Sequence, residues 1–192
     1  MNSTVAHMVR VAGKRPANLA TDVQGSGQDF IWAHALLGSM ASDAEGGVFG
    51  WGELHQDYRV IRYDARGHGR SDCHGDAIDF SWDALARNLW DVVDSYTQAP
   101  VVLGGASMGC ATALYAACER PSRVRGLVLV IPPTAWEARR AKKGNYENFA
   151  RIARLSRGLP LKLLKFLPRS SADRGFQKHT LSIMARHLAS AN

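Results

Sequence analysis

The stretch that decides the fold is Gly105-Ala106-Ser107-Met108-Gly109. An apolar run, residues 100–105, precedes the serine, and an alanine-rich helical pattern follows it to Glu119. A serine on a sharp strand-to-helix turn needs flanking glycines, because the close backbone approach leaves no room for Cβ atoms. Backbone N–H groups at the start of the helix can then stabilise negative charge beside the hydroxyl. The pattern predicts a nucleophilic Ser107; a glycine-rich turn that merely contains a serine is the alternative.

Strand and helix patterns alternate around this turn. Apolar or β-branched runs predict strands at residues 29–34, 58–63, 100–105 and 126–131. Apolar residues at three- and four-residue steps predict a helix from about Ser81 to Tyr96, and a second helix follows Ser107. Continuous apolar runs are typical of strands that are buried on both faces of a parallel sheet. The sequence therefore predicts an α/β fold, a mostly parallel sheet with flanking helices.

Composition limits the class of protein further. The chain has 192 residues, of which 46% are hydrophobic, and no stretch approaches the roughly 18–20 apolar residues of a membrane span. Residues 1–15 lack the apolar segment of a signal peptide. The three cysteines show no CxxC spacing, so we expect neither a disulfide framework nor a metal site. Together these features predict a cytoplasmic protein.

Charge divides the chain into two units. Residues 1–132 carry 11 Lys and Arg against 14 Asp and Glu, whereas residues 133–192 carry 13 against 3. We expect the first unit to be the α/β core through its last strand, and the second to be a basic helical segment. Such a segment could meet anionic lipid, nucleic acid or an acidic partner. Charge clusters are more often solvated helical surfaces, so we expect no specific nucleic-acid partner and do not favour contact with a membrane surface.

Three stretches in register carry a family resemblance. They are residues 32–39, which contain Trp-Ala-His-Ala-Leu-Leu-Gly-Ser, residues 63–72, which contain Tyr-Asp-Ala-Arg-Gly-His-Gly-Arg-Ser-Asp, and the turn around Ser107. Together they resemble the α/β-hydrolase superfamily of esterases, lactonases and haloperoxidase-like proteins. The resemblance implies that Ser107 is the nucleophile and that the backbone N–H groups of Met108 and Leu36 form an oxyanion hole. It also implies a small-molecule acyl substrate and neither an organic cofactor nor a metal ion.

The resemblance gives other residues a structural role near the site. His34, Arg66 and His68 are expected to support the loops by hydrogen bonds rather than to act as the general base. The sequence departs from the family at Ala35, where glycine is usual. If the loop needs a positive φ at that position, the oxyanion hole is slightly distorted.

The family's acid and histidine are missing from the expected places. A serine hydroxyl needs a base and an orienting carboxylate, which in this family follow the serine in the order acid, then histidine. The chain instead stops at Asn192, after what resembles the beginning of a helical cap. The remaining candidates are Glu137 for the acid, with His179 or His187 for the base.

Two functional interpretations stay open. One is a serine hydrolase of an ester, lactone or related acyl substrate that is incomplete in this chain. The other is a non-catalytic, truncated hydrolase remnant or an interaction module with a basic helical arm. In both, residues 127–131 form the last strand of the sheet with an unpaired edge, which predicts self-association through that strand.

Overall fold

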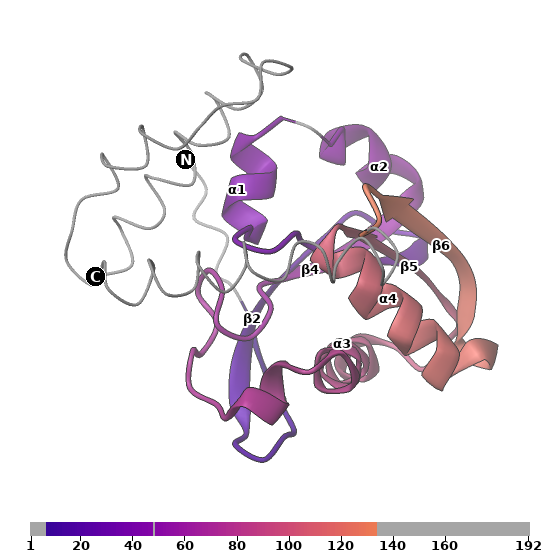
Figure 1. Cartoon of the computed structure of the whole chain (residues 1–192). Coiled ribbons are helices and arrows are strands. Elements are labelled where there is room, and N and C mark those ends of the chain that lie inside the picture. The colour runs from indigo at the N-terminus through magenta and orange to yellow at the C-terminus, as the bar shows by residue number, and fades with distance from the viewer. Residues whose placement is uncertain (1–6, 48, 134–192) are drawn as a thin grey trace.

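The computed structural model describes residues 7–47 and 49–133, and these form one six-stranded sheet with helices on both faces (Figure 1). The strands are β1 (His7–Val11), β2 (Ala17–Gln24), β3 (Gln28–Ala33), β4 (Tyr58–Tyr63), β5 (Val101–Ala106) and β6 (Val124–Val130). The helices are α1 (Met40–Glu45), α2 (Trp51–Asp57), α3 (Trp82–Tyr96) and α4 (Met108–Glu119), with short 3-10 turns η1 (Ala77–Phe80) and η2 (Pro121–Arg123). The predicted α/β class is confirmed.

Strand order explains how the sheet brings separate loops together. The order is β1-β2-β4-β3-β5-β6, in which β4, β3, β5 and β6 are parallel and β2 runs antiparallel to both of its neighbours, β1 and β4. Ala33 pairs with Gly105, and Ala106 pairs with Val130. Since parallel neighbours end at the same edge of a sheet, the loops that follow β3, β5 and β6 lie next to one another.

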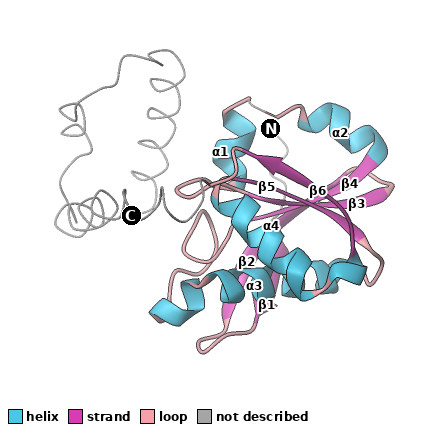
Figure 2. Cartoon of the chain, turned by 45° about the vertical axis from the view of Figure 1, so that its right-hand side comes forward, coloured by secondary structure: helices cyan, strands magenta, loops and turns pink. Residues whose placement is uncertain are grey.

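The two faces of the sheet are covered by different helices (Figure 2). Side chains alternate along β3: Ile31 and Ala33 join the larger apolar core, which α3 and α4 cover, whereas Phe30 and Trp32 join a smaller core with residues of α2. Helix α3 begins where predicted, because the Ser81 side chain accepts a hydrogen bond from the Ala84 N–H at 3.3 Å. The central strands are therefore buried on both faces, as their continuous apolar runs indicated.

Predicted and observed elements differ mainly at the N-terminal edge. Strand β4 has the predicted bounds, β5 lies one residue later, and β6 begins two residues earlier and ends one residue earlier than predicted. Strands β1 and β2 and the helices α1 and α2 were not predicted. The alternation of β1, in which Val9 and Val11 are buried and their neighbours exposed, is the ordinary signal of a half-buried strand.

The basic unit, and with it the predicted acid and the predicted base of the triad, fall outside the described part of the chain. Glu137, His179 and His187 all lie there, so their predicted roles stay predictions, as does the division at residue 132. Within residues 7–47 and 49–133, no helix is long and apolar enough to cross a membrane.

Candidate active site

Ser107 occupies the sharp turn between β5 and α4. Its φ of 48° and ψ of −103° fall outside the usual regions for a residue with a side chain. The Ser107 N–H donates to the carbonyl of Val130 at 3.0 Å, which fixes the turn to the end of β6. The serine is half-buried, whereas Ala106 and Met108 on either side are buried. A strained, accessible serine between buried neighbours has the geometry expected of a nucleophile elbow.

The two flanking glycines are required by close backbone contacts. A Cβ added to Gly109 would meet the Ala33 carbonyl oxygen without room for either atom, and one added to Gly105 would meet the backbone of Gly109. The helix N-terminus is therefore pressed against the end of β3 as well as β5. Beneath the turn, the Cys110 thiol lies 2.9 Å from the Gly105 carbonyl oxygen, and burial raises its pKa, which keeps the thiol neutral.

The loop predicted to complete the oxyanion hole follows β3, the strand next to β5. Residues 35–38 form a tight turn in which the Gly38 N–H donates to the Ala35 carbonyl at 2.9 Å. The positive φ of this loop falls on Leu37, at 62°, and not on Ala35. The alanine that departs from the family pattern is thus accommodated without strain, and the predicted distortion at Ala35 does not arise. Leu36, whose N–H is the predicted donor, has an exposed side chain, and Met108 begins α4 with its N–H outside the helical ladder.

His34 is buried and engaged on both ring nitrogens. The Ala65 N–H donates to Nε2 at 2.9 Å, so Nε2 carries no proton, and Nδ1–H donates to the Ala35 carbonyl at 2.8 Å. Burial, with a smaller effect of the neighbouring His68, lowers the pKa of His34 to about 4. At neutral pH the ring is therefore uncharged, and it connects the loop after β3 to the loop after β4. This geometry agrees with a supporting role and leaves no free nitrogen for proton transfer.

Arg66 and His68 extend the same framework. The buried Arg66 guanidinium donates to the backbone carbonyls of Arg15 at 2.8 Å and His74 at 3.2 Å. His68 packs against His34, with ring centroids 4.9 Å apart, and its Nδ1 lies 3.0 Å from the Arg66 carbonyl. Arg66 also donates to the Asn88 side chain on α3 at 3.5 Å, so its guanidinium faces the β1–β2 connection and α3. The supporting roles expected of Arg66 and His68 beside Ser107 stay predictions.

Asp64 is an organising residue for which the sequence analysis named no role. Its Oδ1 accepts the Met40 N–H at 2.7 Å and its Oδ2 accepts the Arg70 N–H at 2.9 Å. It thereby ties the start of α1, which follows the turn 35–38, to the loop after β4. An aspartate at the end of a buried strand, followed by two glycines and a serine, was the available signal.

The described residues contain no complete catalytic triad that includes Ser107. Within residues 7–47 and 49–133, the Ser107 hydroxyl makes no hydrogen bond, and no group of three His, Cys, Asp or Glu side chains could hold a metal ion. The structure thus brings together Ser107, Met108 and the loop of Leu36, with His34 linking that loop to the loop after β4. It does not place the predicted acid and base.

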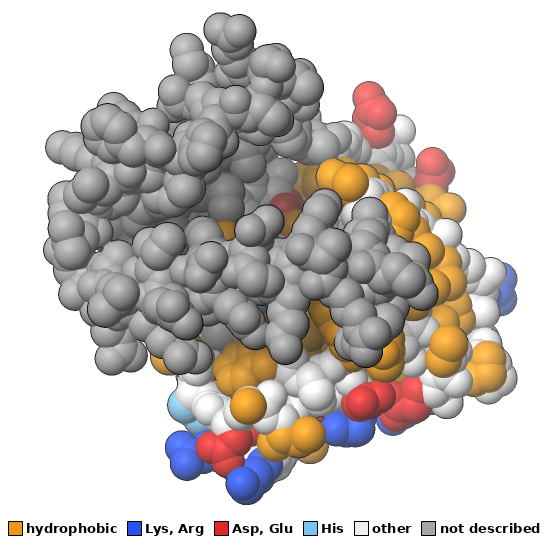
Figure 3. Space-filling model, in the orientation of Figure 1, with side chains coloured by type: hydrophobic (Ala, Val, Ile, Leu, Met, Phe, Trp, Pro, Cys, Tyr) orange, Lys and Arg blue, Asp and Glu red, His pale blue; other side chains and the backbone are white. Residues whose placement is uncertain are grey.

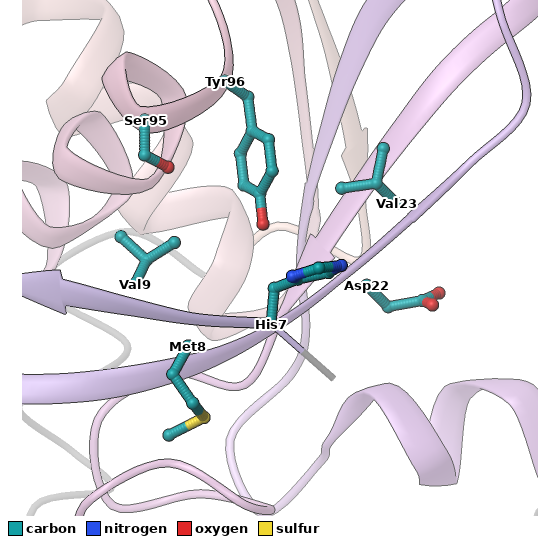
Figure 4. Close-up of a pocket in the computed structure, with 7 residues that line it drawn as sticks. All are labelled: His7, Met8, Val9, Asp22, Val23, Ser95 and Tyr96. Carbon is teal, nitrogen blue, oxygen red and sulfur yellow. The ribbon is translucent and has the colours of Figure 1, made fainter. Parts of the chain in front are cut away.

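A pocket of about 370 Å³ lies elsewhere (Figure 4). It is lined by His7, Met8, Val9, Asp22, Val23, Ser95 and Tyr96. These residues belong to β1, β2 and the end of α3, and β1 is at the opposite edge of the sheet from β5 and β6. The Tyr96 hydroxyl, which points toward the strands in Figure 4, is already hydrogen-bonded to the Thr21 hydroxyl. The volume of this pocket is therefore no guide to the chemistry of Ser107.

Comparison with known proteins identifies relatives that are similar to part of this chain. The chain is 36% identical over 80 residues to lipase LipV of Mycobacterium tuberculosis, covering 42% of this chain and 30% of that one. It is 36% identical over 81 residues to monoglyceride lipase of Rattus norvegicus, covering 40% and 26% respectively. The chain thus spans less than a third of the length of these curated relatives.

Solved structures agree with the fold. A thermophilic esterase from Thermogutta terrifontis matches with a TM-score of 0.69 and 25% identity, over 95% of this chain and 66% of that one. An epoxide hydrolase from Vigna radiata matches with a TM-score of 0.58 and 17% identity, over 70% and 41%, a likeness of fold alone. The family model described as alpha/beta hydrolase fold matches residues 30–157, which include all three motifs. The chain belongs to the alpha/beta hydrolase fold family.

Proposed function

We propose that this chain is the nucleophile-bearing part of a serine hydrolase that acts on an ester, lactone or related small acyl substrate. The observation that carries the proposal is the strained backbone of Ser107, held between β5 and α4 by a hydrogen bond to Val130. Strain of this kind persists only where the surrounding structure enforces it, and it is concentrated at functional sites. The lipase and esterase names of the relatives support the same class of reaction.

In the proposed reaction the Ser107 hydroxyl oxygen attacks the acyl carbon while a general base accepts its proton. The backbone N–H groups of Met108 and Leu36 would stabilise the oxyanion, and the alcohol leaves with a proton from the base. Water then releases the acid from the acyl-enzyme by the reverse proton transfers. His179 or His187, oriented by Glu137, are the candidates for the base, since both nitrogens of His34 are occupied by backbone groups. The mechanism needs no organic cofactor or metal ion.

The test is covalent labelling with a fluorophosphonate, followed by peptide mapping and by hydrolysis of p-nitrophenyl acetate. We expect any label on the peptide that contains Ser107, and none in Ser107→Ala. Ser122→Ala, an exposed serine on η2, is the matched control and should behave as the wild type. If neither His179 nor His187 serves as the base, labelling and turnover are expected to be slow, because removing the base of a triad lowers kcat by about a million-fold. A label on Ser39 or Ser71 would contradict the assignment.

A second function is favoured by one observation, the open edge of β6 beside a serine that has no base among the described residues. In that function the chain is a non-catalytic interaction module with a basic helical arm. The same assay separates the two proposals. Equal rates for wild type and Ser107→Ala support the interaction module, whereas a rate that falls with Ser107→Ala and with His179→Ala or His187→Ala supports the hydrolase.

A further inference from the structure

Three residues other than glycine have a positive φ in the described part of the chain, and all three lie in loops at the carboxyl ends of the parallel strands. They are Leu37 at 62°, Ser107 at 48° and Ile131 at 54°. Each follows one of three parallel strands, β3, β5 and β6, which are consecutive in the sheet. Two further strained positions therefore flank the proposed nucleophile, one on each side.

Ile131 is the more unusual of the two. It directly follows Val130, which pairs with Ala106 and accepts the hydrogen bond from the Ser107 N–H. Its backbone is thus roughly one strand spacing, about 4.8 Å, from that of Ser107. A β-branched residue with positive φ is a genuine outlier. The side chain is 73% exposed, so burial against described residues contributes little to offset the backbone strain.

Leu37 has the corresponding position on the other side of Ser107. It is the third residue of the turn 35–38, where a positive φ normally selects glycine or asparagine. Its side chain is 41% exposed, and the neighbouring Leu36 is 55% exposed. The turn itself would form more readily with glycine, so local backbone geometry does not explain a leucine there.

We propose that Leu37 and Ile131 are specificity-determining residues that contact an apolar alkyl group of the substrate on either side of Ser107. Two strained backbone positions that both present large apolar side chains beside a reactive group are best explained by contacts made to a ligand. An alkyl group would remove both side chains from water, whereas a charged group would lose hydration against them. The inference rests on the proposed hydrolase function and narrows it to esters with an apolar acyl or alkyl group.

The experiment measures binding of a homologous series of methyl ketones, from 2-pentanone to 2-nonanone, to the full chain by ligand-observed NMR. Methyl ketones resemble the acyl group of an ester but have no leaving group. We expect the dissociation constant of the wild type to fall by about two- to fourfold for each added methylene, the upper value being that of a fully buried CH₂. Leu37→Asn and Ile131→Asn should each reduce this dependence, and the double variant should abolish it.

Asparagine is the informative substitution because it tolerates a positive φ and replaces an apolar side chain by a polar one. Both variants should therefore fold at least as well as the wild type in thermal unfolding, and Ile131→Gly tests the same contact with no side chain. Met8→Gln, an exposed residue on β1 at the far edge of the sheet, is the control and should keep the full dependence. Loss of the dependence in Met8→Gln would assign it to non-specific binding and overturn the proposal.

Failure of this inference and failure of the proposed function give different results. Ser107→Ala should leave ketone binding unchanged, because binding needs no nucleophile, while it removes labelling by the fluorophosphonate. A wild type that binds no ketone, or binds all of them equally, overturns the alkyl contact whatever the labelling shows. Chain-length dependence that survives in both asparagine variants also overturns it, since the alkyl group would then lie elsewhere.

Discussion

Replacing Asp43 by asparagine is expected to stabilise the fold at neutral and alkaline pH. Asp43 lies on α1, the helix that follows the turn 35–38, and its Oδ2 accepts the Trp32 indole N–H at 2.8 Å. Burial is the main cause that raises its pKa to about 6; the Trp32 hydrogen bond and the positive charge of Arg62 act in the opposite direction. An asparagine oxygen can accept the same indole hydrogen bond without a charge. The substitution therefore removes the desolvation of a carboxylate and keeps its contact.

The sign follows from linkage between protonation and folding. Because the pKa in the folded state is raised, the contribution of Asp43 to stability is complete below the unfolded pKa of about 3.9 and is lost as the pH rises through about 6. A difference of about two units corresponds to at most roughly 3 kcal/mol at 1.36 kcal/mol per unit, and partial solvation reduces this to about 1–2 kcal/mol. Asp43→Asn should exceed the wild type by that amount at pH 8, and the gap should close near pH 4.

Urea unfolding of wild type and Asp43→Asn at pH 4.5, 6 and 8 measures the effect. The control is Glu53→Gln, which removes a solvated carboxylate at an exposed position on α2. Its difference in unfolding free energy from the wild type should change little between these pH values. If Asp43→Asn is the less stable protein at pH 8, the ionised carboxylate contributes more through Arg62 and Trp32 than its burial costs. That result would refute the reasoning.

Two further predictions concern the elbow and the sheet edge. Gly109→Ala should destabilise the fold by about 3 kcal/mol or more in urea unfolding, because its Cβ would overlap the Ala33 carbonyl. The matched control is Gly52→Ala on α2, whose added Cβ meets nothing within 4 Å. It should raise the free energy of unfolding by roughly 0.5–1 kcal/mol. Equal effects of the two would contradict the close approach. We expect the wild type to self-associate and Leu127→Lys to be monomeric, since a lysine on an edge strand opposes pairing with another chain. Size-exclusion chromatography with light scattering measures both states. A wild type that already elutes as a sharp monomer would disprove association through β6.

The edge prediction rests on features that the structure makes visible together. Strand β6 is at the end of the sheet among the described strands, and Leu127 and Val128, on opposite faces, are both about two-fifths exposed. In Figure 3 hydrophobic side chains gather along the right-hand side, where Figure 1 places β6. No charge interrupts Leu127–Val130, so nothing within that stretch of the strand opposes pairing with another chain.

The central part of the fold could be predicted because its signals are local. The turn around Ser107 needs glycines at two fixed positions, and the buried strands β5 and β6 read as continuous apolar runs whatever surrounds them. Strand β1 was missed because alternation over five residues is a weak signal. Strand β2 was missed because its buried run includes the polar residues Thr21 and Asp22, whose place in the sheet is set by tertiary contacts. Helix α1 has six residues, and its first N–H groups donate hydrogen bonds to the side chains of Ser39 and Asp64, which belong to different loops. No pattern within the helix itself announces such a start.

The positive φ angles of Leu37 and Ile131 could not be predicted from the residue types at these positions. A glycine-rich motif predicts a positive φ because glycine permits it, and the motif around Ser107 is of that kind. Leucine and isoleucine argue against a positive φ, so any reading from local propensity assigns these two positions to ordinary loop conformations. Only the neighbouring strand ends, the turn 35–38 and the exit from β6, impose the unusual geometry. Positions at which propensity and structure disagree in this way are expected to be functional, and both of these lie beside the proposed nucleophile.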